Sequence, residues 1–219
     1  IRVHEYLMDL VQRHKNRPEE FGDDMIKVLI GAEITGDDGE MRSLDDDELV
    51  QFTLLLYVAG TETVMRLLGN AAVVLAANPK QRAELVADPS LIPNAIEELL
   101  RFEAPSPVNG RWTMKDIDLH GVQIPAGSKV LLLTGSAGRD DTAFPDADRF
   151  DIHRDIKKHV TFGYGIHFCL GASLARTEGR IALEETLRRI PEWSLVPGRT
   201  IRQHTSTVRG YSEVGISVR

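Results

Sequence analysis

Cysteine is almost absent from this chain: Cys169 is the only one among 219 residues. A single thiol excludes a disulfide within the chain, and it cannot supply the four ligands that a structural zinc site takes. This usage is typical of a reducing compartment, so we expect a cytoplasmic protein. Basic residues are also outnumbered, with 26 Lys and Arg against 33 Asp and Glu, and the net charge of −7 argues against nonspecific binding to nucleic acid.

Long hydrophobic runs are missing as well. The most apolar run, Phe52 to Gly60, is far shorter than the roughly 20 residues of a membrane-spanning helix, and no signal peptide is visible. We therefore predict no membrane association. Hydrophobic residues make up 42% and charged residues 27% of the chain, which is typical of globular domains, and the length favours a single domain.

Hydrophobic periodicity predicts a mainly α-helical chain with small β-sheets. The predicted helices cover residues 1–15, 23–33, 44–77, 80–87, 93–103 and 172–190. The predicted strands cover residues 117–119, 122–124, 129–133, 193–195 and parts of 201–219. Ser43 is expected to cap the longest helix, and polar turns are expected at residues 35–39 and 125–127. Residues 140–161 show little periodicity, and a stretch of this length without secondary structure is uncommon unless it has a function.

Cys169 lies in a glycine-rich segment directly before the predicted helix 172–190. The segment reads Phe162-Gly163-Tyr164-Gly165-Ile166-His167-Phe168-Cys169-Leu170-Gly171. Free N–H groups and the positive end of the helix dipole favour a thiolate at such a position, and a thiolate can be the single protein ligand of a haem iron. The alternative is a buried cysteine in a glycine-rich turn, because free cysteine is often a small core residue.

The spacing of this segment resembles the haem-binding loop of the cytochrome P-450 family. The pattern is Phe162-x-x-Gly165-x-His167-x-Cys169-x-Gly171, and every defining position is filled. The resemblance is to soluble bacterial members. It implies a haem-thiolate monooxygenase that binds haem b through Cys169, uses O₂ as co-substrate and oxidises a small organic molecule. It also implies that Phe162, Gly163, His167 and Gly171 contact the haem.

A second part of the resemblance lies inside the predicted helix 44–77, at Ala59-Gly60-Thr61-Glu62-Thr63. A glycine in mid-helix costs about 1 kcal/mol relative to alanine, so Gly60 calls for an explanation. The family pattern implies that Ala59 and Gly60 make room for the porphyrin. It also implies that Thr63 positions O₂ and a water molecule, and that Glu62 lies on a proton-delivery route. The alternative is ordinary packing of small residues with a surface glutamate.

A third part is Glu98-Leu99-Leu100-Arg101. Glu98 and Arg101 share a helix face, and such pairs are usually exposed and worth well under about 1 kcal/mol. The resemblance implies instead a buried network, completed by Arg149 of Asp148-Arg149-Phe150, that holds the chain beneath the cysteine loop. Replacement of the neighbouring Glu97 is expected to be mild.

Two further residues resemble partners of the haem propionates. Arg111 follows a proline-containing stretch, and His167 lies in the cysteine segment. Carboxylates at the edge of a buried macrocycle need cationic or N–H donors. The alternative for either residue is an ordinary exposed polar side chain.

Charge is unevenly distributed along the chain. Residues 1–50 hold 14 acids and 6 bases, whereas residues 151–190 hold 5 acids and 7 bases. The basic side chains near the cysteine segment are Arg154, Lys157, Lys158, Arg176 and Arg180. In the family, this face receives an acidic ferredoxin or a flavin protein, and a basic surface attracts such partners. An ordinary surface of mixed charge is the alternative.

The resemblance covers the C-terminal half of a typical member. We expect residues 1–219 to be the C-terminal haem-binding part of a single domain, with the N-terminal half absent. Two alternatives to a monooxygenase follow from this: a truncated remnant that binds haem without catalysis, and an apo scaffold. In either case we expect self-association through apolar surface on helix 44–77 that the missing half would cover.

Overall fold

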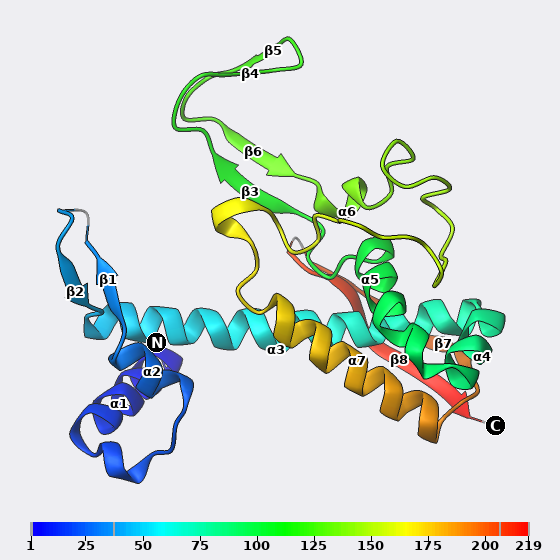
Figure 1. Cartoon of the computed structure of the whole chain (residues 1–219), viewed down its shortest axis with the longest axis horizontal. Helices are drawn as coiled ribbons and strands as arrows, with labels where there is room; N and C mark the ends of the chain where they lie inside the picture. Colours follow the sequence, from blue (N-terminus) through cyan, green and yellow to red (C-terminus); the bar gives the residue numbers. More distant parts are fainter. Residues whose placement is uncertain (1, 37, 206, 219) are drawn as a thin grey trace. The chain divides into compact units, whose positions relative to one another are not determined.

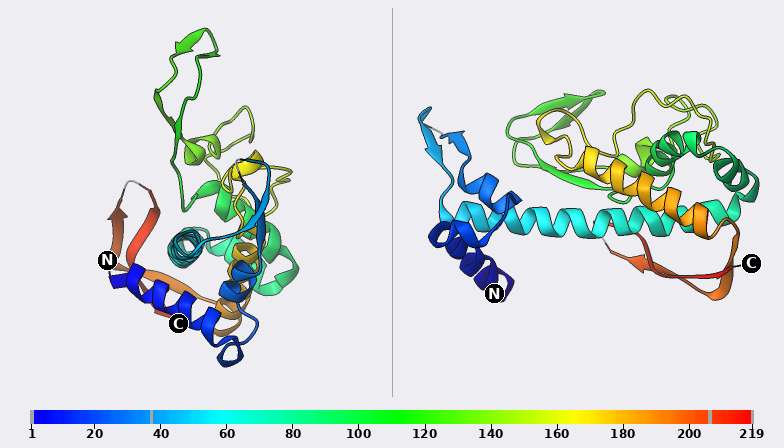
Figure 2. Two further views of the ribbon diagram at one scale, coloured as in Figure 1. Left: turned by 90° about the vertical axis from the view of Figure 1, so that its left-hand side faces the viewer. Right: turned by 60° about the horizontal axis from the view of Figure 1, so that its bottom comes forward.

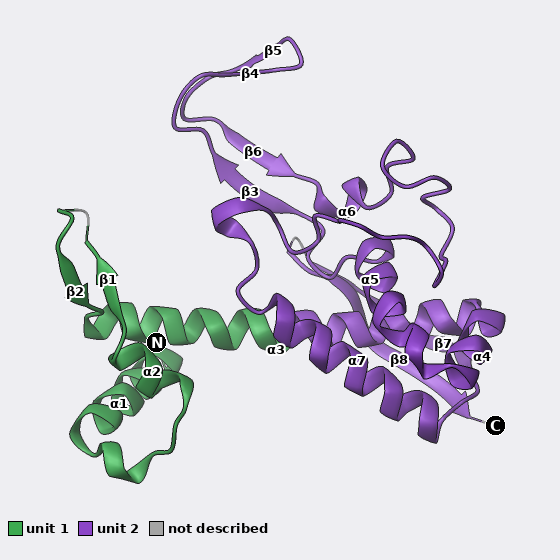
Figure 3. Cartoon of the chain, in the orientation of Figure 1, with its two compact units in different colours: residues 1–61 green, residues 62–219 purple. Residues whose placement is uncertain are grey.

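A computed structural model describes residues 2–36, 38–205 and 207–218. The chain divides into two compact units, residues 1–61 and 62–219 (Figure 3). The longest helix, α3 (Asp46–Ala77), contributes to both units. At about 1.5 Å per residue, this helix is about 48 Å long.

Unit 1 contains two short helices and a hairpin in front of α3. The elements are α1 (Arg2–Asn16), the 3₁₀ turn η1 (Pro18–Glu20), α2 (Met25–Ile30), β1 (Glu33–Thr35) and β2 (Met41–Ser43). The strands β1 and β2 pair antiparallel. Apolar side chains of α1, α2 and the start of α3 form one core, made of Leu7, Val11, Ile26, Leu29, Leu49 and Val50.

The start of α3 differs from the prediction, and Ser43 as its cap is wrong. Ser43 ends strand β2, so the helix begins later. The Asp45 carboxylate accepts the Glu48 N–H at 2.8 Å, and the Glu48 carboxylate accepts the Asp45 N–H at 2.9 Å. This reciprocal arrangement satisfies two N–H groups that the helix itself leaves unpaired. The hairpin also shortens the predicted helix 23–33, which ends at Ile30.

The described residues of unit 2 form four helices besides its part of α3, three two-stranded antiparallel sheets and two 3₁₀ turns (Figure 1). The helices and turns are α4 (Pro79–Ala87), η2 (Pro89–Leu91), α5 (Ile92–Phe102), α6 (Thr134–Ala137), η3 (Gly165–His167) and α7 (Ala172–Arg189). The strands are β3 (Asn109–Trp112), β4 (Ile117–Leu119), β5 (Val122–Ile124), β6 (Lys129–Leu132), β7 (Trp193–His204) and β8 (Arg209–Val218). They pair as β3 with β6, β4 with β5, and β7 with β8.

The core of unit 2 lies between α5, α7 and the second half of α3. Gly179 of α7 permits this packing, because a Cβ there would lie 3.2 Å from Leu67 and 3.3 Å from Ile96. The β7–β8 ribbon contacts another side of α3 (Figure 2), where the Trp193 indole donates to the Ala72 carbonyl at 2.9 Å. Helix α5, which carries Glu97, Glu98 and Arg101, is therefore fixed from several sides.

The fold class is confirmed: the chain is mainly helical with small sheets. The predicted helices 80–87, 93–103 and 172–190 and the strands 117–119 and 122–124 match the observed bounds within one residue. Strand β3 and helix α6 escape prediction because their sequences, Asn-Gly-Arg-Trp and Thr-Gly-Ser-Ala, show no apolar pattern. Residues 140–161 contain neither helix nor strand. Four positions lie outside the described residues. They are residue 1 of the predicted helix 1–15, residue 37 of the predicted turn 35–39, and residues 206 and 219 of the range 201–219 in which strands are predicted.

One helix, α3, meets the length and composition of a membrane-spanning segment, and 33% of its most apolar window is buried. Core helices of globular proteins meet the same criterion. The expected absence of membrane association stays a prediction.

Candidate functional site

The cysteine loop, residues 162–171, is shaped by main-chain contacts and by glycine. The Cys169 N–H donates to the Phe162 carbonyl at 2.8 Å and closes the loop. Gly163 and Gly165 have φ values of 76° and 66°, a region that other residues rarely adopt. A Cβ at Gly163 would also lie 2.9 Å from the His167 carbonyl oxygen. Only glycine therefore fits at position 163.

The thiol of Cys169 is exposed at the N-terminus of α7. The Ala172 N–H donates to the Cys169 carbonyl at 3.3 Å, and Gly171 occupies the N-cap. Large apolar side chains of the loop and of the first turn of α7 are exposed with it; they are Tyr164, Ile166, Phe168, Leu170 and Leu174. Large exposed apolar surfaces usually bind something.

The exposed Cys169 thiol and the apolar side chains around it fit a haem. Among the described residues, no group of three or more His, Cys, Asp or Glu side chains could hold a metal ion. A flat apolar macrocycle needs a single axial protein ligand and apolar contacts, and the loop offers one thiol within an apolar surface. No described atom lies within 4 Å of where a Cβ would stand at Gly171, so the end of the loop is open at this position.

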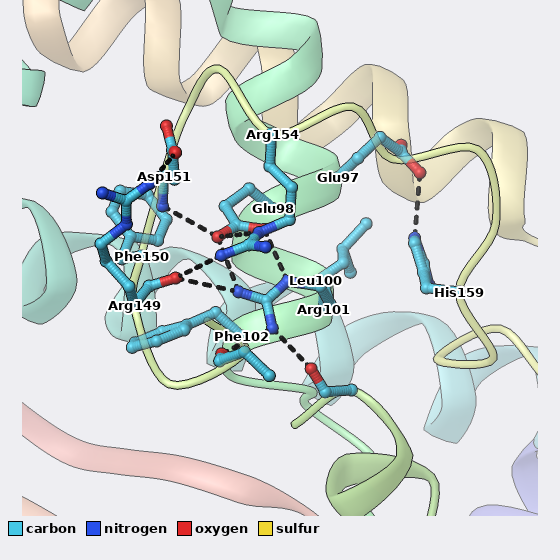
Figure 4. A network of polar contacts seen from close by, with 12 residues as sticks. Glu97, Glu98, Leu100, Arg101, Phe102, Arg149, Phe150, Asp151, Arg154 and His159 are labelled. Carbon is cyan, nitrogen blue, oxygen red and sulfur yellow. Dashed lines mark hydrogen bonds and ion pairs between the residues drawn. The ribbon is translucent and has the colours of Figure 1, made fainter. Parts of the chain in front are cut away.

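Beneath the loop, Glu98 and Arg101 form an ion pair in which both side chains are 0% exposed (Figure 4). The Arg101 guanidinium donates to the two carboxylate oxygens of Glu98 at 2.6 and 2.7 Å. It also donates to the carbonyls of Gly138 and Ala147 at 2.5 and 2.8 Å, and Glu98 accepts the Asp151 N–H at 2.9 Å. The pair thus fixes the irregular segment after α6.

The structure differs from the prediction at the third member of this network. The Arg149 side chain is exposed and pairs with Asp151 at 2.8 Å, and only its carbonyl takes part, accepting from Arg101 at 3.2 Å. Arg154 supplies the second guanidinium, with its Nε 3.3 Å from Glu98. The neighbouring Phe150 takes the buried position and directs the Arg149 side chain outward.

Glu97 is not the ordinary surface residue that was expected. Its carboxylate accepts a bidentate pair of hydrogen bonds from Arg176 at 2.6 and 2.9 Å, and it lies 3.0 Å from Nε2 of His159. Burial by itself would raise the pKa of Glu97, but the hydrogen bonds from His159 and Arg176 outweigh it and lower the pKa to about 2.

This pKa shift predicts acid sensitivity. A carboxyl group with a lowered pKa stabilises the fold above the unfolded-state value of about 4.3, and this contribution is lost as the pH falls toward 2. Glu97→Gln should therefore cost about 2 kcal/mol of unfolding free energy at pH 6 and about half of that near pH 3. Urea unfolding of both proteins between these pH values tests the prediction. A difference that does not change with pH would contradict it.

The residues of α3 that resemble an oxygen-binding pattern follow one another along a single helix. Glu62 pairs with Arg66 at 2.8 Å and is partly buried, as is Thr63. Ala59 and Gly60 are exposed, and no described atom lies within 4 Å of where a Cβ would stand at Gly60. Gly60 and Thr63 are three residues apart and share a face of the helix.

The two residues that resemble propionate partners are both exposed. Arg111 lies on β3, and its guanidinium donates to the Gly110 carbonyl at 2.8 Å. His167 ends the turn η3 within the cysteine loop. Their roles toward a haem stay predictions.

Comparison with known proteins decides the family. The family model described as Cytochrome P-450 matches residues 81–210, more than half of the chain. The chain belongs to the cytochrome P-450 family. Vitamin D(3) 25-hydroxylase of Pseudonocardia autotrophica is 40% identical over 99% of this P-450 chain and 53% of its own length. The 6-deoxyerythronolide B hydroxylase of Saccharopolyspora erythraea is 41% identical over 87% of this chain and 45% of its own length.

Solved structures of other P-450 proteins have the same fold as this chain. HmtN, a post-tailoring hydroxylase involved in himastatin biosynthesis, superposes with a TM-score of 0.90 at 36% identity, covering 100% of this chain and 57% of the HmtN chain. CYP109E1 from Bacillus megaterium in complex with testosterone gives a TM-score of 0.89 at 35% identity, covering 100% of this chain and 59% of the other. This P-450 chain spans about half the length of the curated relatives it matches.

Sequence reasoning missed the contacts made by four residues near the cysteine loop of this P-450. They are Glu97, Arg154, His159 and Arg176, and the sequence suggests Arg154 and Arg176 only as basic surface residues. Each has an identity that is common on protein surfaces, and their partners lie 56 to 79 positions away in the sequence. The adjacent pair Glu97-Glu98 on an otherwise apolar helix was the one available signal.

Proposed function

We propose that this chain is the C-terminal haem-binding part of a haem-thiolate monooxygenase. The observation that carries the proposal is the exposed Cys169 thiol at the N-terminus of α7, within an apolar and glycine-rich loop. When bound, haem b would supply the activation of O₂ and the transfer of one oxygen atom to an organic substrate. Cys169 would be the protein ligand of the iron.

The remaining site residues would hold the cofactor. Phe162, Gly163 and Gly171 would lie along the porphyrin face, where Gly163 keeps the turn of the loop and Gly171 adds no side chain. Arg111 and His167 would donate to the two propionates. Ala59 and Gly60 would admit the macrocycle beside α3, since neither carries a side chain larger than a methyl group.

Thr63 and Glu62 would control the arrival of protons. The Thr63 hydroxyl can hold a water molecule, and the Glu62 carboxylate, kept in place by Arg66, can exchange protons with solvent. Thr63→Ala in the full protein should keep the haem and consume reductant, while O₂ is released as hydrogen peroxide instead of entering product. Thr61→Ala is the matched control, because Thr61 is exposed and its hydroxyl donates to the Tyr57 carbonyl. Product per reductant should fall at least tenfold only in Thr63→Ala, about the contribution of one proton-transfer group. Equal yields in both variants would contradict the role.

The substrate would be a bulky and mostly apolar molecule. The relatives named above are hydroxylases of vitamin D(3) and of 6-deoxyerythronolide B, and one structural neighbour holds testosterone. Binding of such molecules to the purified protein, read from the haem absorption spectrum, tests this assignment.

Electrons would come from a ferredoxin or a flavin protein in the cytoplasm. Of the five basic residues expected to attract it, Arg154 is largely buried, and Arg176 and Arg180 pair with Glu97 and Glu184. Lys157 and Lys158 are exposed, although Lys157 lies 3.6 Å from Asp155, and they therefore contribute most of the positive charge that a partner would meet. Loss of electron transfer in a double Lys157→Glu, Lys158→Glu variant is the expected result.

The absorption spectrum of the reduced protein under carbon monoxide tests the proposal as a whole. A strongly red-shifted band is expected for a thiolate haem. A thiolate haem without product would indicate a haem-binding remnant. No haem after expression with ample haem supply would indicate an apo scaffold, and either result would overturn the monooxygenase.

A further inference from the structure

Two neighbouring carboxylates of α5 hold two different parts of the chain. Glu98 binds the segment that ends at Arg154, and Glu97 binds His159, which precedes the cysteine loop (Figure 4). Glu97 also binds Arg176, which follows the loop. We propose that Glu97, His159 and Arg176 are positioning residues that hold the cysteine loop in place for its ligand. The role of the loop rests on the proposed function, but the contacts do not.

The Arg176 side chain connects Glu97 to the first residue of the loop. Its guanidinium makes the bidentate pair with Glu97 and lies 4.5 Å from the centre of the Phe162 ring. A planar guanidinium can bind a carboxylate along its edge and stack on an aromatic face at the same time. The Phe162 carbonyl in turn accepts the Cys169 N–H at 2.8 Å. A continuous set of contacts therefore joins Glu97 to Cys169.

His159 anchors the chain that enters the loop. Its Nδ1 lies 3.3 Å from the Thr161 N–H and so acts as an acceptor, which leaves Nε2 protonated to donate to Glu97. The His159 side chain is only 3% exposed. The Thr161 hydroxyl also donates to the Leu100 carbonyl of α5 at 3.0 Å. These contacts fix the two residues that lie directly before Phe162.

The cysteine loop lies in a part of the chain with little secondary structure, so side-chain contacts are needed to hold it in place. The Glu98 network reaches Arg154, and α7 begins at Ala172, whereas residues 155–171 hold only the short turn η3. An irregular segment opens easily unless side chains tie it to the core. The contacts of Glu97 supply such ties at both ends of the loop. The pKa of Arg176 is raised mainly by its hydrogen bond to Glu97 and in smaller part by the nearby Cys169, which agrees with this arrangement.

Amide hydrogen exchange of Cys169 tests the proposal in the full protein without added cofactor. Glu97→Gln removes the charge that binds Arg176, so the Cys169 amide should exchange about 10 to 100 times faster, as expected for loss of a charge-assisted hydrogen bond. The Leu99 amide inside α5 serves as an internal reference and should change much less. Glu178→Gln, an exposed position on α7, is the control and should leave both amides unchanged.

Two conservative variants separate positioning from general destabilisation. His159→Gln keeps an N–H that can reach Glu97 and should preserve slow exchange at Cys169, whereas His159→Phe should not. Arg176→Lys keeps the charge but loses the planar pair and should resemble Glu97→Gln. Equal Cys169 exchange in Glu97→Gln and Glu178→Gln would overturn the proposal, as would equal acceleration at Cys169 and Leu99. Absence of a thiolate-haem spectrum in the wild-type protein would overturn the proposed function and leave this result standing.

Discussion

Glu98→Ala should yield insoluble protein, or protein with a sharply lowered unfolding midpoint. Glu98 and Arg101 are 0% exposed, and removal of the carboxylate leaves the Arg101 guanidinium buried without its counter-charge. Loss of one partner from a buried pair costs about 3–5 kcal/mol, a large part of the roughly 5–15 kcal/mol that stabilises a typical protein. Soluble yield and urea unfolding of the full protein measure the effect.

Arg149 and Arg154 provide the matched comparison. Arg154→Ala should also be strongly destabilising, because its guanidinium contacts Glu98 and the carbonyls of Pro145 and Asp146. Arg149→Ala should cost no more than about 1 kcal/mol, as is usual for an exposed ion pair, since only its carbonyl contributes to the network. The reverse order, with Arg149→Ala more harmful than Arg154→Ala, would contradict the observed geometry.

Cys169→Ser should abolish the thiolate-haem spectrum and leave the fold intact. The Cys169 side chain is exposed, so its replacement removes no packing, and the unfolding free energy should change by less than about 0.5 kcal/mol. A neutral hydroxyl cannot replace the thiolate as the strong electron donor to iron. The reduced protein under carbon monoxide should therefore lose its red-shifted band.

The fold of the Cys169→Ser variant is the control for its absorption spectrum. Circular dichroism and the thermal midpoint should match those of the wild type, which shows that the missing band reflects ligation and not misfolding. Retention of the red-shifted band in Cys169→Ser would exclude Cys169 as the ligand. Loss of helical structure in this variant would contradict the exposed position of the side chain.

Much of the local structure could be read from the sequence. Helix α7 follows Gly171 and continues to Arg189 without a proline, and β4 and β5 alternate apolar and polar residues on either side of the turn His120-Gly121. These elements depend on residues that are close in sequence. The cysteine loop could be recognised for the same reason, since its five defining positions lie within ten residues. The strands β1 to β3 could not, because each has only one large apolar residue, whereas β4 to β6 have at least two each.

The sequence by itself determined the helical class, the cysteine loop and the pairing of Glu98 with Arg101, because each depends on spacing along one helix or one turn. Only the tertiary structure decided which arginine completes the network and what Glu97 does. Arg149 and Arg154 are equally basic, and Glu97 and Glu98 are identical side chains on the same helix. The packing of Phe150 into the core directs Arg149 outward, and the approach of α7 brings Arg176 to Glu97. Burial and long-range contact assign these roles, and neither property is encoded in the identity of a residue or of its neighbours.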